Sequence, residues 1–392
     1  MIPLYKPLVT GRESLYIDDA IKTGKFSGDG IFTQRCREWL ESTLECKKAL
    51  LTTSCTHALE MAAMLLDISN GDEIIVPSFT FVSTGNAFVL HGAKLVFVDI
   101  RPDTMNLNEM LIEQAISEKT KAIIAVHYAG VSCEMDVIMK LANKYNLIVI
   151  EDAAHALMSK YKNQYLGTIG HLGCFSFHES KNYHCGEGGA LLINDERFIE
   201  RAEIIRDKGT NRKNYFRGEV DKYTWVDIGS SYLMSELNAA FLYPQLLIAE
   251  DINNDRLKSW ETYYRALINL NLENKLTLPS IPRQVNHNAH IFYIKVPSKG
   301  IRSGLISYLQ ENGISTSFHY IPLHSSDMGE VHGVFNKEDI YTSIESERLL
   351  RLPMYYGLKQ SDIFDIVSLI RDYFDKENSD EKSRRLLGKT EF

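Results

Sequence analysis

A lysine and an aspartate stand at positions of the sequence where they could serve one reaction. Leu147–Ile150 is an apolar run that ends in Glu151 and Asp152, so Asp152 stands where a buried strand would open into a cleft. Lys181 lies in a polar turn between a β-like run and the glycine-rich stretch 186–189. A lysine in a partly buried site can lose its proton and attack a carbonyl group. Each residue also fits a plainer role, Asp152 as a helix N-cap and Lys181 as a surface cation.

Together the two groups match the needs of one cofactor, pyridoxal 5′-phosphate (PLP). That cofactor uses a lysine amine to hold its aldehyde and a carboxylate to keep its pyridine nitrogen protonated. Its phosphate could lie against Thr53–Leu59, a hydroxyl-rich turn that leads into an apolar-periodic helix, because the free N–H groups at a helix start attract anions. Ser54 in this turn is equally suited to be an ordinary N-cap. Ser176, shortly before Lys181, could donate a further hydroxyl.

A ring cofactor also needs a flat apolar surface. The segment Pro77–Val82 follows the expected strand Glu73–Val76 and supplies Phe79 and Phe81 at alternate positions. Either ring could stack on a pyridine ring, and both could instead be core residues.

Two other patterns near Lys181 do not form the sites that they resemble. His178-Glu179 resembles the start of a zinc-binding motif, but the next histidine is His184, six residues later, on a different helix face. Gly186–Gly189 lacks the Gly-Lys-Ser/Thr that follows in a phosphate loop. We therefore expect no metal site, and we interpret the glycines as backbone freedom beside Lys181.

The elements around these residues alternate between strands and helices from about Lys48 to Asn194. Several apolar runs show no in–out alternation, which is typical of strands buried on both faces of a parallel sheet. The expected strands are Glu73–Val76, Lys94–Val98, Ala122–His127, Leu147–Ile150, Gly173–Phe177 and Gly189–Ile193, and the expected helices include Cys55–Leu66 and Met135–Tyr145. This order predicts an α/β domain with a mainly parallel sheet, in which ligands bind at the carboxyl ends of the strands.

We expect two domains and a tail. The large domain spans residues 1–249, and a long helical pattern from Leu237 to roughly Leu267 leads out of it. Residues 250–375 mix one strand with several helices, which indicates a smaller α+β domain. Its expected elements are the strand Ile291–Val296 and the helices Arg302–Glu311, Glu345–Leu350 and Asp362–Phe374. Residues 376–392 are polar and charged, and we expect them to form a frayed tail.

Composition narrows the class of protein. The 392 residues include 43 basic and 51 acidic side chains, and this mildly acidic balance disfavours nucleic acid as a partner. The six cysteines show neither a CxxC pair nor zinc-like spacing, so we expect reduced thiols. No stretch has the length of a membrane span, and the first residues do not resemble a signal peptide. We expect a cytoplasmic protein that does not insert into membranes.

The sequence resembles the DegT-type nucleotide-sugar aminotransferases, which are PLP enzymes with the aspartate aminotransferase fold (fold type I). The resemblance covers roughly residues 1–375. The segments that show the resemblance are Thr53–Leu59, Pro77–Thr84, Val96–Asn106, Glu151–His155, Phe175–Lys181, Gly186–Gly189 and Tyr320–His324. A narrower resemblance is to the dTDP-4-amino-4,6-dideoxygalactose transaminases. It is carried by Phe175–Tyr183, Arg206–Arg212 and Asp227–Ser235.

The resemblance implies a role for each site residue. Lys181 matches the lysine that binds the cofactor, and Asp152 matches the partner of the pyridine nitrogen. The implied phosphate and stacking positions are Ser54, Cys55, Thr56, Ser176 and Phe81. Three residues depart from the usual pattern of the family. Cys55 replaces a glycine, His155 replaces a glutamine beside the ring hydroxyl, and Ser231 replaces an asparagine that reaches the phosphate from the neighbouring subunit.

The implied reaction moves an amino group from L-glutamate to the C4 ketone of dTDP-4-keto-6-deoxy-D-glucose. The product would be dTDP-4-amino-4,6-dideoxy-D-galactose, used for surface polysaccharide such as enterobacterial common antigen or O-antigen. Arg212, in the basic stretch 206–217, could bind the diphosphate or simply be solvated. The resemblance also places Tyr320 and His324 near the sugar and implies a homodimer with shared active sites.

Three other functions are alternatives to this reaction. A different nucleotide keto sugar, or a different amino position, remains open. A non-catalytic PLP- or sugar-binding regulator would not need both Lys181 and Asp152. A sugar 3-dehydratase of the same fold would carry histidine in place of Lys181.

Overall fold

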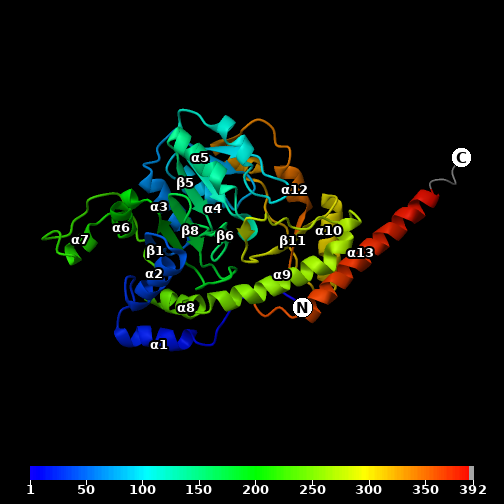
Figure 1. Ribbon diagram of the computed structural model, residues 1–392, viewed down its shortest axis with the longest axis horizontal. Coiled ribbons are helices and arrows are strands. Elements are labelled where there is room, and N and C mark those ends of the chain that lie inside the picture. The colour runs from blue at the N-terminus through cyan, green and yellow to red at the C-terminus, as the bar shows by residue number, and fades with distance from the viewer. Residues whose placement is uncertain (388–392) are drawn as a thin grey trace.

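The computed structural model describes the backbone of residues 1–387 and the side chains of residues 1–377. Its centre is an eight-stranded sheet in the order β1-β9-β8-β5-β4-β2-β3-β12 (Figure 1). The strands are β1 (Lys48–Thr52), β2 (Glu73–Pro77), β3 (Lys94–Val98), β4 (Thr120–Val126), β5 (Ile148–Asp152), β8 (Leu172–Ser176), β9 (Gly189–Ile193) and β12 (Gly333–Phe335). All pairs from β8 to β12 are parallel, whereas β9 pairs antiparallel with both of its neighbours. The predicted α/β class with a mainly parallel sheet is confirmed.

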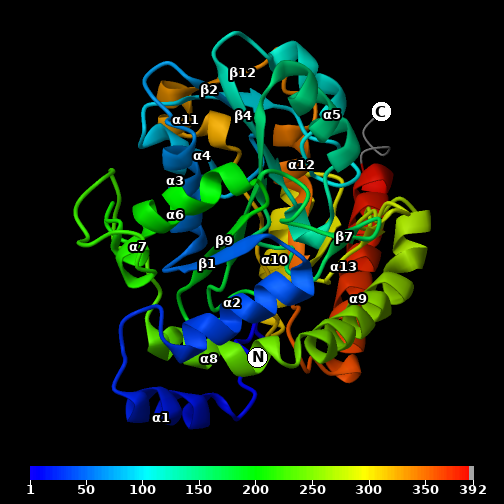
Figure 2. The same cartoon turned by 60° about the vertical axis from the view of Figure 1, so that its left-hand side comes forward.

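Helices cover both faces of this sheet because successive strand residues point to opposite sides. Ile75 and Val149 belong to one apolar cluster, together with residues of α2 (Ile31–Leu44), α5 (Met135–Tyr145) and α8 (Glu236–Leu246). Their neighbours in the strands pack in a second cluster with α3 (Cys55–Leu65), α4 (Val82–Val89) and α6 (Ile199–Arg206). Figure 2 shows α2 and α8 beside the sheet, with α1 (Glu13–Thr23) lying against α8.

A smaller unit has its own core around an antiparallel strand pair. Its strands are β11 (Phe292–Lys295) and β13 (Leu349–Leu352), and its helices are α9 (Ala249–Leu272), α10 (Lys299–Glu311), α12 (Thr342–Arg348) and α13 (Gln360–Leu387). Figure 1 shows α9 as the long helix that connects this unit to α8. Trp260, Phe292 and Leu309 lie in the core of the unit. The remaining α-helices are α7 (Arg212–Phe216) and α11 (Asp327–His332). The remaining strands form a small sheet of β6 (Lys160–Tyr161), β7 (Gln164–Tyr165) and β10 (Val285–Asn286).

The structure differs from the sequence predictions in one domain boundary, in one helix and in the C-terminal tail. Strand β12, from the segment assigned to the small domain, forms the edge of the large sheet beside β3. The expected helix Glu345–Leu350 ends at Arg348, because Leu349 begins the strand that pairs with β11. Helix α13 runs on to Leu387, so most of the expected tail is helical; the segment is rich in good helix formers. Residues 388–392 lie outside the described residues.

Within residues 1–387, no helix combines the length and the apolar character needed to cross a membrane.

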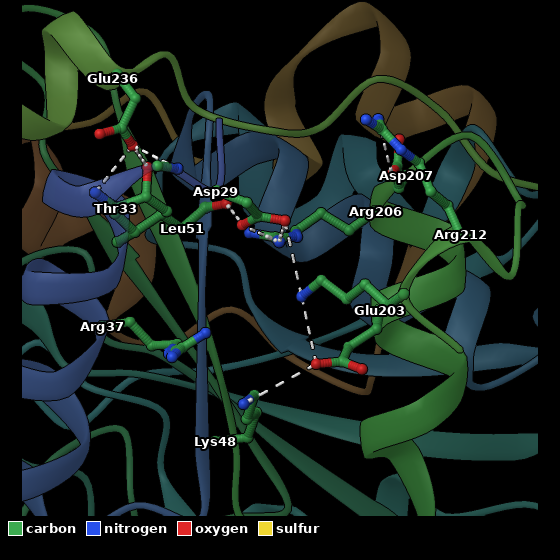
Figure 3. A network of polar contacts seen from close by, with 12 residues as sticks. Asp29, Thr33, Arg37, Lys48, Leu51, Glu203, Arg206, Asp207, Arg212 and Glu236 are labelled. Atoms are coloured by element: carbon green, nitrogen blue, oxygen red, sulfur yellow. Dashed lines mark hydrogen bonds and ion pairs between the residues drawn. The ribbon is translucent and has the colours of Figure 1, made fainter. Parts of the chain in front are cut away.

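A buried polar network fixes the loop before α2 (Figure 3). The carboxylate of Glu236, at the start of α8, accepts hydrogen bonds from the backbone N–H groups of Gly30, Phe32 and Thr33 at 2.8–3.0 Å. The guanidinium of Arg206 is only 2% exposed and binds Asp29 in the same loop at 2.5 Å. Glu236 therefore satisfies the unpaired N–H groups at the start of α2 and joins that helix to α8.

Glu236→Gln should lower the stability of the fold. The amide would set an N–H₂ group against backbone donors and would remove the charge at the start of α2, at a cost of about 2 kcal/mol. We expect a lower melting temperature and a lower urea midpoint than in the wild type. Glu250→Gln, on the exposed first turn of α9, is the matched control. Equal melting of the two variants would contradict this role of Glu236.

Candidate active site

One cavity of about 470 Å³ lies where the carboxyl ends of the parallel strands face the smaller unit. Asp152 at the end of β5 and Ser176 at the end of β8 line it from the large domain, with residues of the loop after β2. Tyr320, Arg351 and Met354 line it from the smaller unit. The position agrees with the rule that ligands bind beyond the carboxyl ends of such strands.

Most of the predicted site residues meet in this cavity. It is lined by Ser54, Cys55, Thr56, Phe81, Asp152, His155, Ser176, Lys181 and Tyr320. The other three predicted residues, Arg212, Ser231 and His324, do not line this cavity. Arg212 lines a second cavity of about 480 Å³ beside Asp29 and Lys213, and Ser231 is exposed on a segment that pairs with Asp207.

His324 does not line the cavity in this chain. Its Nδ1 lies 2.7 Å from the hydroxyl of Ser78, and its Nε2 lies 3.2 Å from the carboxylate of Asp339. Both ring nitrogens therefore have partners within the protein, and the ring packs against Phe97 and Phe335. His324 therefore has a structural role at this edge of the sheet, and its expected approach to the sugar stays a prediction.

Lys181 lies on the loop that joins the antiparallel strands β8 and β9. Backbone hydrogen bonds from Phe177 to Gly188 and from Glu179 to Gly186 close this loop at 2.8 and 2.9 Å. Gly186 has a φ of 80°, which glycine adopts without strain. Burial lowers the pKa of Lys181 from 10.5 to about 8, although the nearby carboxylate of Asp152 opposes that shift. About a tenth of the Lys181 amine is thus neutral at pH 7, far more than for an exposed lysine.

Asp152 is held in place by two donors. The hydroxyl of Thr84 donates to Oδ2 at 2.6 Å, and the backbone N–H of Ala154 lies 3.2 Å from Oδ1. Thr84 in turn lies 2.8 Å from the hydroxyl of Thr80. The carboxylate is 6% exposed and lines the cavity, so it is available to a cationic ring nitrogen.

The start of α3 opens into the cavity. Ser54 is the N-cap of this helix and accepts a hydrogen bond from the N–H of His57 at 3.1 Å, as the plainer interpretation of Ser54 predicts, and its phosphate contact stays a prediction. Thr56 donates to the hydroxyl of Ser83 at 2.8 Å, and both side chains line the cavity. A Cβ atom at Gly189 would lie 2.3 Å from the carbonyl carbon of Ser54, so only glycine lets β9 approach the helix start this closely.

The two phenylalanines after β2 differ in their packing. Phe79 is 1% exposed and packs edge-on against Tyr128, with ring centres 5.0 Å apart. Phe81 is 56% exposed and lines the cavity. Only Phe81 is available to stack on a ligand ring. With the lysine, the carboxylate and the hydroxyl-rich helix start, the residues present fit PLP.

The comparison with known families decides the identity of this fold. The sequence profile of the DegT/DnrJ/EryC1/StrS aminotransferase family matches residues 8–371. The chain belongs to this aminotransferase family. It is therefore a PLP-dependent aminotransferase, and the large domain has the PLP fold type I.

Three relatives illustrate the range of the family. The spore coat polysaccharide biosynthesis protein SpsC of Bacillus subtilis is 30% identical over 385 residues, 95% of this chain and 96% of SpsC. The structure of PseC from Helicobacter pylori, an aminotransferase involved in the biosynthesis of pseudoaminic acid, is 25% identical with a TM-score of 0.85, over 96% of this chain and 99% of PseC. Spr1654 of Streptococcus pneumoniae, 25% identical, is known in a PLP form with a TM-score of 0.87, over 96% of this chain and 99% of that one.

His290, His319 and Arg351 are among the residues of this aminotransferase cavity that sequence reasoning missed. The ring of His155 lies 4.2 Å from that of His290 and 6.2 Å from that of His319. Burial holds the pKa of all three histidines well below the usual range, and the charge of Lys181 lowers each further. The N–H of Ala129 donates to Nδ1 of His155 at 3.3 Å, so the ring proton of neutral His155 is on Nε2, toward Tyr320.

The lowered pKa of Lys181 predicts a pH profile for its reaction with aldehydes. A buried lysine whose pKa falls to about 8 becomes reactive as the pH rises through that value, whereas exposed lysines need a pH near about 10.4. The rate of reductive labelling of cofactor-free protein, measured at Lys181 by peptide mass spectrometry, should reach half its maximum near pH 8. Asp152→Asn should move this midpoint to lower pH, because it removes the anion that favours the charged amine. A midpoint near that of the exposed lysines would contradict the burial argument.

Proposed function

We propose that this aminotransferase moves an amino group from L-glutamate to the C4 ketone of dTDP-4-keto-6-deoxy-D-glucose. The product is then dTDP-4-amino-4,6-dideoxy-D-galactose, for surface polysaccharide synthesis. The observation that carries the amino-transfer chemistry is the pair of Lys181 and Asp152 in one cavity. The sugar substrate is supported by the narrower sequence resemblance and by relatives that act in polysaccharide and pseudoaminic acid biosynthesis.

Several residues that line the cavity have a task in this reaction. Bound PLP supplies an electron-accepting ring that stabilises negative charge on the carbon that carries the amino group. Asp152 keeps the ring nitrogen protonated, and Thr84 fixes the carboxylate that does so. The neutral amine of Lys181 would remove the proton from the amino-bearing carbon of the donor and deliver it, across the intervening nitrogen, to the carbon of the cofactor's aldehyde group. Cys55, Thr56 and Ser176 hold the phosphate at the start of α3, and Phe81 covers the ring.

We propose that the neutral ring of His155, which lines the cavity, donates from Nε2 to the oxygen on the cofactor ring. This role matches the glutamine that the family usually carries, because both side chains present an uncharged N–H group. The hydroxyl of Tyr320 lies 3.4 Å from the same nitrogen and also lines the cavity, and we propose that it contacts the sugar.

The nucleotide diphosphate is assigned to Arg212, and a further contact to the cofactor phosphate is assigned to Ser231, both outside this chain's cavity. Arg212 and its basic neighbours line the second cavity, and Ser231 is exposed nearby in the sequence. We propose that the enzyme is a homodimer in which these residues serve the partner's active site.

The absorption spectrum of the bound cofactor tests both halves of the reaction. L-glutamate should convert the aldehyde form of the cofactor to the amine form, and the keto sugar should then restore the aldehyde form. Comparison of 3-keto and 4-keto nucleotide sugars identifies the acceptor. A bound cofactor that responds to no amino acid would favour the non-catalytic regulator, whereas a response to a different sugar would favour the alternative acceptor.

Lys181→Ala should reduce turnover at least about 1000-fold, since the proton-transfer group is lost. The measurement is steady-state formation of 2-oxoglutarate with the keto sugar present. Lys258→Ala, on the exposed side of α9, is the control and should keep wild-type turnover. Substantial activity in a folded Lys181→Ala variant would overturn the assignment of Lys181.

A further inference from the structure

Asn182, the residue after Lys181, ties the β8–β9 loop to the smaller unit. Its Nδ2 donates to the backbone carbonyl of Asn288 at 3.0 Å, and its Oδ1 lies 2.9 Å from Nδ1 of His290. All three side chains are buried. Loss of either bond would therefore leave a polar group unpaired away from water.

The same segment of the smaller unit also holds the chain that follows β5. Nδ2 of Asn288 donates to the backbone carbonyls of His155 and Leu157 at 2.8 and 2.9 Å. The ring of His290 packs against the ring of His155, with ring centres 4.2 Å apart. Residues 288–290 thus contact both the loop that carries Lys181 and the histidine that shares its cavity.

The backbone of residues 288–290 is strained and is fixed from α9. Ala289 has a φ of 48°, in the left-handed region that residues other than glycine rarely adopt. The buried guanidinium of Arg256 donates to the carbonyls of Ala289 and His290 at 3.1 and 2.5 Å. Strain of this kind persists only where the surroundings over-determine the conformation, and it clusters at functional sites. Asn182 is therefore tied to a rigid anchor.

The contacts of Asn182 also fix the tautomer of His290. Because Nδ2 of Asn182 donates to a carbonyl, its Oδ1 faces His290 and accepts from the Nδ1–H group. Burial and the charge of Lys181 hold the pKa of His290 well below its usual range, so its Nε2 carries a lone pair and no proton. An acceptor at Nε2 cannot occupy the lone pair of the neutral Lys181 amine, whereas the other tautomer could donate to it.

We propose that Asn182 is a positioning residue for amino transfer. Through its bonds to Asn288 and His290 it seats the Lys181 amine against the smaller unit and leaves the lone pair of that amine free for the substrate proton. Asn182 does not line the cavity, so it acts through Lys181 and His290. This inference rests on the role of Lys181 in the proposed function, and it is independent of which donor or sugar the enzyme uses.

Asn182→Ala tests this role first in the cofactor-free protein. Release of the loop should hydrate the Lys181 amine, and its pKa should rise toward the usual value of lysine. The half-maximal pH of reductive labelling at Lys181 should therefore move up by about one unit or more from its value near 8, opposite to the effect of Asp152→Asn. The substitution leaves in place the groups that act on this amine, which are Asp152, Cys55, Arg351, His155, His290 and His319.

The PLP-loaded enzyme gives a second readout. In Asn182→Ala, the rate at which saturating L-glutamate converts the cofactor should fall about 10- to 100-fold, because the base is misplaced. The L-glutamate concentration that gives half of this rate should stay unchanged, since Asn182 lies outside the cavity.

His290→Phe breaks the same bond from the smaller unit and keeps an aromatic ring against His155. It should produce the same fall in rate and the same rise in the labelling midpoint. The double variant should be no slower than the slower single variant, because both substitutions remove one shared interaction.

Asn238→Ala is the matched control. Asn238 of α8 donates to the backbone carbonyls of Cys185 and Glu187 at 3.0 and 2.9 Å, so it holds the other limb of the same loop to the large domain. Its substitution should lower the melting temperature and leave the labelling midpoint and the glutamate rate unchanged.

The outcomes separate this proposal from the proposed function. An unchanged midpoint and rate in Asn182→Ala would overturn the positioning role while the aminotransferase assignment stands. An equal shift in Asn238→Ala would also overturn it, since any tether of the loop would then suffice. Additive effects of Asn182→Ala and His290→Phe would contradict the link through their shared bond. A raised midpoint in Asn182→Ala, combined with a wild type that does not respond to L-glutamate, would refute the proposed donor and support the positioning role.

Discussion

Adjacent residues of a strand point to opposite faces of a sheet, and the end of β5 puts two carboxylates to different uses for that reason. Glu151 is fully buried and accepts hydrogen bonds from the N–H groups of Gly167, Ile169 and Gly170 at 2.6–2.7 Å. These bonds fix the loop that leads into β8. Because the β8–β9 loop carries Lys181, the strand that presents Asp152 to the cavity also anchors the chain that presents the lysine.

The charges in the cavity differ in their burial. Lys181 and Arg351 supply cationic groups, and the buried Asp152 supplies one carboxylate. A second carboxylate, that of Glu187, also lines the cavity, but its side chain is 71% exposed to solvent. Burial lowers the pKa of His155, His290 and His319, so these rings stay neutral, and burial keeps Cys55 as a thiol by raising its pKa. The inner part of the cavity therefore holds two cationic groups and one carboxylate, although the whole chain has a net charge of −8. A local excess of this kind suits a phosphorylated cofactor and an acidic donor together.

Features set by the order of residues along the chain could be predicted from the sequence. Strands Lys94–Val98 and Gly189–Ile193 have the predicted bounds, because apolar runs between turn residues mark buried strands. Asp152 and Lys181 were found because each follows such a run. Arg351, His290 and His319 could not be found, since they reach the cavity only when the smaller unit folds against the sheet. Phe79 and Phe81 carry the same sequence signal, and only packing against Tyr128 distinguishes them.

Two of the three predicted site residues that do not line the cavity, Arg212 and Ser231, lie on one projecting segment of the chain. Residues 207–231, which include α7, project away from the large sheet (Figure 1). This segment exposes Phe216, Trp225 and Ile228 at 70–77% of their surface. Large apolar side chains on one segment are typical of an interface. Arg212 and Ser231, the two residues whose predicted partners are the nucleotide and the phosphate, lie on the same segment. The apolar surface and the absence of both residues from this chain's cavity thus have one common explanation in the proposed homodimer, in which each segment reaches the active site of the other copy.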